Sequence, residues 1–155
     1  MTEIERLLEQ LDRTWNGEAW HGPSLTAVLA GIEAPIAAAR PLPAAHTVWE
    51  LVGHMAAWQR AVTHRLSDRL VDPSEEENWP RAEPPTDEAW GGMLAALENA
   101  RADLRARVAA LSDEELDDVP GRVGETKYVL IHGAIQHDLY HAGQIVLLAR
   151  EAAGR

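Results

Sequence analysis

Helical periodicity extends through nearly the whole chain, and it constrains the fold more than any other feature. Apolar residues recur at steps of three and four, whereas no segment alternates convincingly between apolar and polar residues as a half-buried strand does. The first apolar stripe predicts an amphipathic helix over residues 2–15, and it consists of Ile4, Leu7, Leu8, Leu11 and Trp15. We therefore expect an all-α protein.

Three longer helices are expected after this first one, over residues 48–66, 86–111 and 126–152. The clearest start is at Thr47, which is followed three residues later by Glu50. In such a capping box the hydroxyl and the carboxylate each accept a hydrogen bond from a free backbone N–H group at the start of the helix.

The connections between these helices are expected to be partly helical. Short helices are predicted over residues 23–32, with Pro23 in the first turn, and over residues 112–116. Residues 72–85 are expected to form a loop, because four of the nine prolines lie there. Four long helices and one long connection predict a single domain over residues 1–155, built as a four-helix bundle.

The charge balance argues against a nucleic-acid partner. The chain has 25 acidic and 14 basic residues, a net charge of −11, and Lys127 is its one lysine. Phosphate binding needs clustered positive charge. The first residues also lack the basic-then-apolar order of a signal peptide, and no apolar run approaches the roughly 18 residues of a membrane span. We expect a soluble, cytoplasmic protein with no membrane partner.

The chain contains no cysteine but seven histidines. Disulfides, thiolate nucleophiles from the protein itself and zinc–thiolate sites are therefore excluded. Any metal chemistry must depend on imidazole and carboxylate groups.

Two of the histidines, His137 and His141, lie four residues apart in the last predicted helix. They are about 40° apart around the helix and can bind one metal ion together. Both lie on the stripe that faces the core, where an imidazole must be either hydrogen-bonded or coordinated, and the sequence leaves both options open. Asp138 stands where the zinc-protease HExxH motif has its glutamate, so a zinc protease is not expected. A surface or interhelix salt bridge is predicted for Asp138.

A third ligand must come from another helix, and His54 is well placed to supply it. It lies in the middle of its helix, beside Gly53 and small alanines that let a facing helix approach closely. His21 lies in a Trp-His-Gly-Pro break, where a turn could direct it into a cleft, and its role stays open. The other three are expected outside the site: His64 at the rim or in solvent, His132 on another face and His46 in an exposed loop.

Three further side chains are candidates for the surroundings of the site. Gln144, one turn after the second histidine of the pair, could hydrogen-bond a ligand imidazole or a bound substrate. Trp58 and Tyr140 border the histidine faces, where they either form the wall of a pocket or pack in the ordinary way. Glu50 lies on the same face as His54, but the helix cap is the preferred interpretation of its role.

Four motifs in register resemble the DinB/YfiT-like family over residues 5–150. They are WHGPSL at residues 20–25, HTVWELVGH at residues 46–54, NWP at residues 78–80 and QHDLYHAGQI at residues 136–145. The resemblance implies an up-down-down-up four-helix bundle with short extra helices, and a divalent metal ion bound by three histidines. By motif match these are His54, His137 and His141.

Three neutral imidazoles suit zinc, nickel, iron or copper better than calcium or magnesium, and zinc or nickel is expected here. Three protein ligands also leave coordination positions open, as in catalytic sites. The resemblance further implies a small-molecule substrate, with either thiol-dependent transferase or isomerase chemistry or hydrolysis. Because the chain has no cysteine, a low-molecular-weight thiol would have to enter as a cosubstrate.

Two other expectations follow from the same resemblance. The alternative to an enzyme is a non-catalytic metal- or ligand-binding bundle that acts in a stress response. A link to DNA is suggested by the family's name alone, and the net charge of −11 argues against it. A homodimer is expected, because bundles of this family are often dimers.

Overall fold

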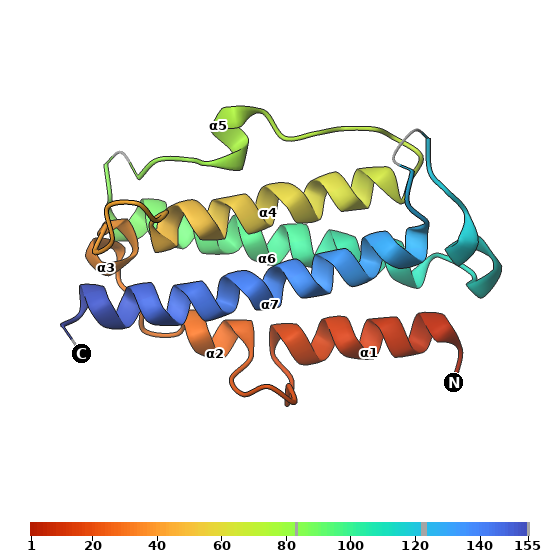
Figure 1. Cartoon of the computed structure of the whole chain (residues 1–155), viewed down its shortest axis with the longest axis horizontal. Helices are drawn as coiled ribbons and strands as arrows, with labels where there is room; N and C mark the ends of the chain where they lie inside the picture. The colour runs from red at the N-terminus through yellow and green to blue at the C-terminus, as the bar shows by residue number, and fades with distance from the viewer. Residues whose placement is uncertain (83, 122–123, 155) are drawn as a thin grey trace.

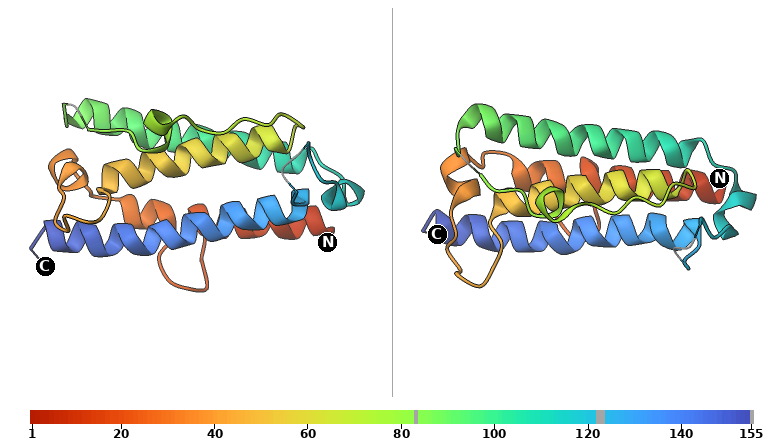
Figure 2. Two further views of the ribbon diagram at one scale, coloured as in Figure 1. Left: turned by 45° about the horizontal axis from the view of Figure 1, so that its top comes forward. Right: turned by 90° about the horizontal axis from the view of Figure 1, so that it is seen from above.

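The computed structural model describes residues 1–82, 84–121 and 124–154. Four long helices form a bundle (Figure 1), and they are α1 (Glu3–Trp15), α4 (Val48–Arg65), α6 (Asp87–Ala109) and α7 (Lys127–Ala152). Helices α4 and α6 run in one direction and α1 and α7 in the other (Figures 1 and 2), so the order is up-down-down-up. The described residues contain no β-strand, and the predicted all-α fold is confirmed.

Four short helices lie in the connections: α2 (Leu25–Leu29), α3 (Ala34–Ala38), α5 (Glu75–Asn78) and the 3₁₀ helix η1 (Asp113–Asp117). Helix α2 follows α1 along the bundle, and both contact α7 (Figure 1). It is shorter than the predicted residues 23–32. Ser24 is its N-cap, so Pro23 lies before the helix, and Gly31 takes a left-handed φ of 78° just beyond its end. None of the helices in the described ranges has the length and apolarity that crossing a membrane requires.

The capping box at the start of α4 is present as predicted. The Thr47 hydroxyl accepts from the Glu50 N–H at 3.1 Å, and the Glu50 carboxylate accepts from the Thr47 N–H at 2.8 Å. These bonds satisfy backbone donors that the helix itself leaves free. They fix the start of the helix that carries His54.

The connection between α4 and α6 runs back along the bundle, and α5 lies halfway, against α4 (Figures 1 and 2). The sequence predicts a loop here, and that prediction is wrong for residues 75–78. Ser74 caps a short helix, because its hydroxyl accepts from the Glu77 N–H at 3.2 Å. Pro80 follows it and rests on Gly53, where an added Cβ would lie 2.1 Å from Pro80 Cγ. The nearest neighbour of Gly53 is therefore a loop residue, and the facing helix α6 also comes close, since Met93 Sδ would lie 3.3 Å from the same Cβ.

The core consists of two apolar clusters with a polar layer between them. One cluster surrounds Trp49, Met55 and Ile145 near the start of α4, and the other surrounds Leu66 and Ile131 near its end. The buried polar residues Gln59, Asp138 and His141 lie between the clusters along α4 and α7, and His54 adjoins them from the part of α4 that carries the first cluster. Because such groups are stable in a core only when they have partners, this layer is the natural place to look for a functional site.

Candidate metal centre

Three imidazoles from two helices converge in the polar layer. Nε2 of His137 lies 2.9 Å from Nε2 of His54 and 3.0 Å from Nε2 of His141. Helix α4 supplies His54, and the i, i+4 spacing on α7 places the other two on one face. Within the described residues, these three form a group whose ligand atoms all lie within 4.8 Å of one another.

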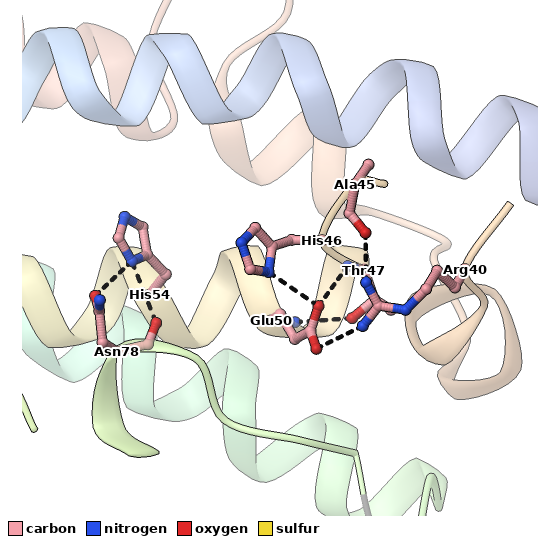
Figure 3. A network of polar contacts seen from close by, with 7 residues as sticks. All are labelled: Arg40, Ala45, His46, Thr47, Glu50, His54 and Asn78. Carbon is pink, nitrogen blue, oxygen red and sulfur yellow. Dashed lines mark hydrogen bonds and ion pairs between the residues drawn. The ribbon is translucent and has the colours of Figure 1, made fainter. Parts of the chain in front are cut away.

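The protonated nitrogen of His54 is determined by a chain of hydrogen bonds. The Trp58 indole is a donor only, and its Nε1 lies 2.8 Å from Asn78 Oδ1, so this atom of the amide is the oxygen. His54 Nδ1 lies 2.7 Å from the same oxygen and 3.2 Å from the Asn78 carbonyl oxygen (Figure 3). Because both are acceptors, His54 Nδ1 carries the proton and donates. Its Nε2 therefore presents a lone pair to the other two histidines.

His141 is oriented in the same way by a residue on its own helix. Its Nδ1 donates to Gln144 Oε1 at 2.6 Å, which leaves a lone pair on Nε2. Gln144 thus makes the contact with a ligand imidazole that its position in the sequence suggests. Hydrogen bonds of this kind fix the tautomer and the ring orientation of metal-binding histidines.

This donor set fits a divalent cation. The lone pairs on Nε2 of His54 and Nε2 of His141 both face His137 Nε2. A neutral His137 can carry one proton on that nitrogen, so it can donate a hydrogen bond to one of these two atoms but not to both. Burial lowers the pKa of His54 and of His141, although their hydrogen bonds to Asn78 and Gln144 oppose the effect. Burial is the largest effect on His137, and the nearby imidazoles of His141 and His54 add to it, so that the pKa of His137 is lowered to about 3. Three neutral imidazoles with convergent nitrogens are the ligands that zinc and similar metals take.

His46 lies much closer to this centre than its position before the helix cap suggests. Trp79 is stacked between two imidazoles, with ring centroids 3.5 Å from His46 and 4.0 Å from His54. His46 is exposed, as expected, but it lines the cavity at the histidines and does not lie outside the site. The sequence could not reveal this stack, because Trp79 comes from the distant connection after α4. The NWP motif that contains Trp79 was the one available signal.

Glu50 joins His46 to a second network beside the site (Figure 3). Its carboxylate accepts from Arg40 Nη2 at 2.7 Å, and one of its oxygens lies 3.2 Å from His46 Nδ1. Burial would raise the pKa of Glu50, but the Thr47 N–H, Arg40 and His46 outweigh it and hold the pKa below its ordinary value. Glu50 therefore has the capping role that the sequence indicates, and it also anchors the residues on one side of the site.

A cavity of about 620 Å³ opens onto the three histidines. Its wall is mostly apolar, with Leu42, Leu51 and Leu147 among the lining residues, and His46, Trp79 and Gln144 also line it. Tyr140 lies at this cavity, 65% exposed, with its ring centroid 5.0 Å from that of His141. An apolar pocket with a few convergent polar groups is the usual form of a small-molecule site.

The two other predicted site residues differ in their distance from the histidines. Trp58 borders two of them, with its ring centroid 6.3 Å from that of His54 and 6.5 Å from that of His137. It lines a different cavity, which also reaches His137, and its indole N–H bonds to Asn78. His21 is exposed in the loop after α1, and the structure does not bring it to the histidine group. The turn at residues 19–22, which contains a bridge between Ala19 and Gly22, leaves its side chain in solvent.

Asp138 is buried, and the prediction of a surface or interhelix salt bridge for it is wrong. It is 4% exposed and accepts from Gln59 Nε2 at 2.8 Å. Burial raises the pKa of Asp138 to about 7, against the opposing effects of Gln59 and Arg101. The face of α7 that carries Asp138 turns inward because α1, α2 and α4 all pack on this helix.

Comparisons with known proteins agree with this architecture. The model of the DinB superfamily matches residues 18–145. The crystal structure of a conserved protein from Enterococcus faecalis superposes with a TM-score of 0.74 at 20% sequence identity, covering 100% of this chain and 99% of that one. At this identity the likeness shows the fold alone. Among curated proteins, no sequence matches this chain.

Proposed function

The chain belongs to the DinB superfamily, and on that premise we propose that it is a metal-dependent enzyme that acts on a small molecule. His54, His137 and His141 would hold one divalent ion, with zinc or nickel as the proposed metals. The observation that carries the proposal is the convergence of three Nε2 atoms, two of which have their lone pairs directed by Asn78 and Gln144.

Held by the three imidazoles, a divalent ion would leave coordination positions open and would supply the Lewis acidity that lowers the pKa of a water molecule or a thiol. The protein contributes the rest of the site. Asn78 and Gln144 hold the two imidazoles in their ligand tautomers, and burial keeps all three rings neutral at pH 7. The mostly apolar wall of the cavity offers a surface for the body of the substrate.

Thiol transfer is the proposed reaction, with a low-molecular-weight thiol as cosubstrate. The absence of cysteine from the chain supports an external thiol. In this reaction the thiolate sulfur forms a bond to an electrophilic carbon of the acceptor. The leaving group departs with its electron pair, and the thiol proton passes to solvent. Hydrolysis at the same centre is the competing reaction.

The test is a panel of thiols assayed with an aryl chloride acceptor, beside a parallel assay of ester hydrolysis. Glutathione, bacillithiol and mycothiol would each be tried with added zinc or nickel. We expect conjugation that is lost on chelation and in His141→Ala but retained in His64→Ala, because His64 lies outside the histidine group. Turnover limited to esters would identify a hydrolase. No turnover, or turnover insensitive to chelation and to His141→Ala, would favour the non-catalytic binding bundle.

We also propose that the partner is a small molecule and not a nucleic acid, and that the chain forms a homodimer. The net charge of −11 supports the first statement, since it opposes approach to a polyanion. Analytical ultracentrifugation would test the second, and a monomer at micromolar concentration would refute it.

A further inference from the structure

A fourth imidazole, that of His46, lies at the histidine cavity without a part in the metal-binding group. Among the described residues that line this cavity, it is the one imidazole outside the group formed by His54, His137 and His141. Its side chain is 44% exposed, so the ring is in contact with solvent as well as with the cavity. A histidine in this position can carry a proton between the candidate centre and water.

Glu50 determines which nitrogen of His46 carries the proton. One oxygen of its carboxylate lies 3.2 Å from His46 Nδ1, and Arg40 Nη2 and the Thr47 N–H also donate to this carboxylate. Burial would raise the pKa of Glu50, but these partners outweigh it and keep the pKa below its ordinary value. An ionised carboxylate can only accept hydrogen bonds. His46 Nδ1 is therefore the protonated nitrogen, and Nε2 keeps its lone pair.

Trp79 holds the ring of His46 parallel to that of His54. The indole plane makes an angle of 1° with the first imidazole and 4° with the second. Stacking covers the face of a ring, whereas the ring nitrogens lie at its edge and stay free to bind. Figure 3 shows Nε2 of His46 on the side of its ring that is turned away from Glu50 and toward His54. A free lone pair and the candidate metal centre thus adjoin the same cavity.

We propose that His46 is the general base for the thiol in the transfer reaction, an inference that rests on the proposed function. As the thiol enters beside the three histidines, its S–H bond breaks, the electron pair stays on sulfur and the proton moves to His46 Nε2. The sulfur then forms its bond to the acceptor carbon, the leaving group departs with its electron pair, and His46 gives the proton to solvent. Between these steps Glu50 stabilises the imidazolium, as the carboxylate of a histidine–carboxylate pair does.

The first arm of the test follows the protonation of His46 without any turnover. Long-range proton–nitrogen NMR of the full-length protein, metal-free and zinc-loaded, would distinguish protonated from unprotonated ring nitrogens at about pH 8, where histidines are generally neutral. We expect a proton on His46 Nδ1 and none on Nε2 in both samples. 2-Mercaptoethanol, a small uncharged thiol, should shift the Nε2 signal of His46 in the zinc-loaded protein. The signals of His64 should not move, because His64 lines a different cavity.

The second arm removes the base. His46→Ala and His46→Gln should each slow thiol transfer about 100-fold, a usual contribution of general base catalysis. Elemental analysis should still find about one zinc ion per chain in both, since the three ligands are intact. Imidazole added to the assay should restore activity to His46→Ala, which leaves room for it, but not to His46→Gln, in which the amide fills the space. The parent at the same imidazole concentration controls for competition at the metal, and His64→Ala should behave as the parent does.

Three results would overturn the proposal: a proton on His46 Nε2 in the parent, a rate in His46→Ala or His46→Gln close to that of the parent, or a slower His46→Ala that retains zinc but is not restored by imidazole. The last result would make His46 a structural support for Trp79 and Glu50. Circular dichroism would establish that each variant is folded, and if His46→Ala is not, the NMR result and the rate of His46→Gln decide.

Failure of this proposal and failure of the proposed function give different results. A parent protein without any thiol transfer would refute the proposed function, and the base for that reaction with it. An active parent beside an equally active His46→Gln would refute the base alone and leave the proposed function standing.

Discussion

Pro80 rests so closely on Gly53 that a Cβ at position 53 would lie 2.1 Å from Pro80 Cγ and 2.9 Å from its Cδ. The contact presses the chain after α5 onto the middle of α4, one residue before His54. Asn78 and Trp79, directly before this proline, then contact His54 by hydrogen bond and by stacking. A glycine without catalytic chemistry thus determines how close the connection comes to the candidate metal centre.

Replacement of Gly53 by alanine should therefore disturb both the fold and the centre. The added methyl group must displace Pro80, and overpacking of this kind costs about 1–3 kcal/mol. Urea denaturation would measure the loss of stability. Gly92→Ala is the matched control, because an added Cβ there meets nothing within 4 Å and alanine favours a helix by about 0.5–1 kcal/mol. A Gly53→Ala protein as stable as its parent would contradict this account of the contact.

Asn78 should control metal affinity although it donates no ligand atom. Asn78→Leu removes the nearer of the two oxygens that accept from His54 Nδ1 and leaves the backbone carbonyl oxygen at 3.2 Å. Loss of such a partner typically weakens metal binding about 10–100-fold. Competition with a chromogenic chelator would measure the change. Trp58→Phe should have a smaller effect, since it removes one donor to Asn78 Oδ1 but leaves the acceptor for His54. Affinity unchanged in Asn78→Leu would show that this hydrogen bond does not orient His54.

The fold was largely predictable because its signals are local. Apolar periodicity and the Thr47–Glu50 capping box place α4 almost to the residue. The errors are in the connections. Residues 75–78 form a helix within a proline-rich segment because Ser74 caps them, and Gly31 shortens the helix expected at residues 23–32. These short elements depend on single caps and on contacts with the bundle, which periodicity does not record.

The site was predictable to a smaller extent. The i, i+4 spacing and the family motifs select the three histidines that the structure brings together. Spacing along one helix could not show that Asn78 and Trp79 fold back onto His54, or that His46 stacks on Trp79. It also missed the burial of Asp138, because this depends on which helices pack around α7. Contacts between distant segments are set by tertiary structure and leave little trace in local sequence.

Glu50 should stabilise the start of α4 through three hydrogen-bonding partners. Glu50→Ala removes the acceptor for the Thr47 N–H and for Arg40, and leaves His46 without its carboxylate. Hydrogen bonds to a charged group contribute about 1.5–3 kcal/mol, and a loss near 2 kcal/mol is expected in urea denaturation. Glu88→Ala, at an exposed position in the first turn of α6, is the control and should change stability much less. Equal losses in the two variants would refute the assigned role.

Asp12 ties α1 to α6 and should make stability depend on acidic pH. Arg105 bonds both of its oxygens at 2.8 and 3.0 Å, and Arg101 also pairs with it. The hydrogen bond from Arg105 is the largest effect on Asp12, and it lowers the pKa of this carboxyl below its ordinary value of 3.8. Burial opposes this shift, and Arg101 adds to it. The folded state therefore favours the ionised carboxylate. Its contribution is present above pH 3.8 and is lost as the pH falls through the lowered pKa.

Melting temperatures of Asp12→Asn and the parent would test this dependence between pH 7 and pH 2.5. The variant should melt lower at pH 7, and the gap should narrow once the pH falls below about 4. Asp103→Asn, at an exposed position on α6, controls for the loss of one negative charge. A gap that is constant over the whole range would mean that the ionisation of Asp12 contributes nothing to stability.

The most direct test of the account is the metal content of the protein and of its histidine variants. After equilibration with zinc or nickel and removal of the excess, elemental analysis should find about one ion per chain. His54→Ala, His137→Ala and His141→Ala should each lose most of it, because each removes one of three convergent nitrogens. His21→Ala and His64→Ala should retain it. A parent protein that binds no divalent ion, or His54→Ala and His141→Ala variants that bind it as the parent does, would contradict the three-histidine centre.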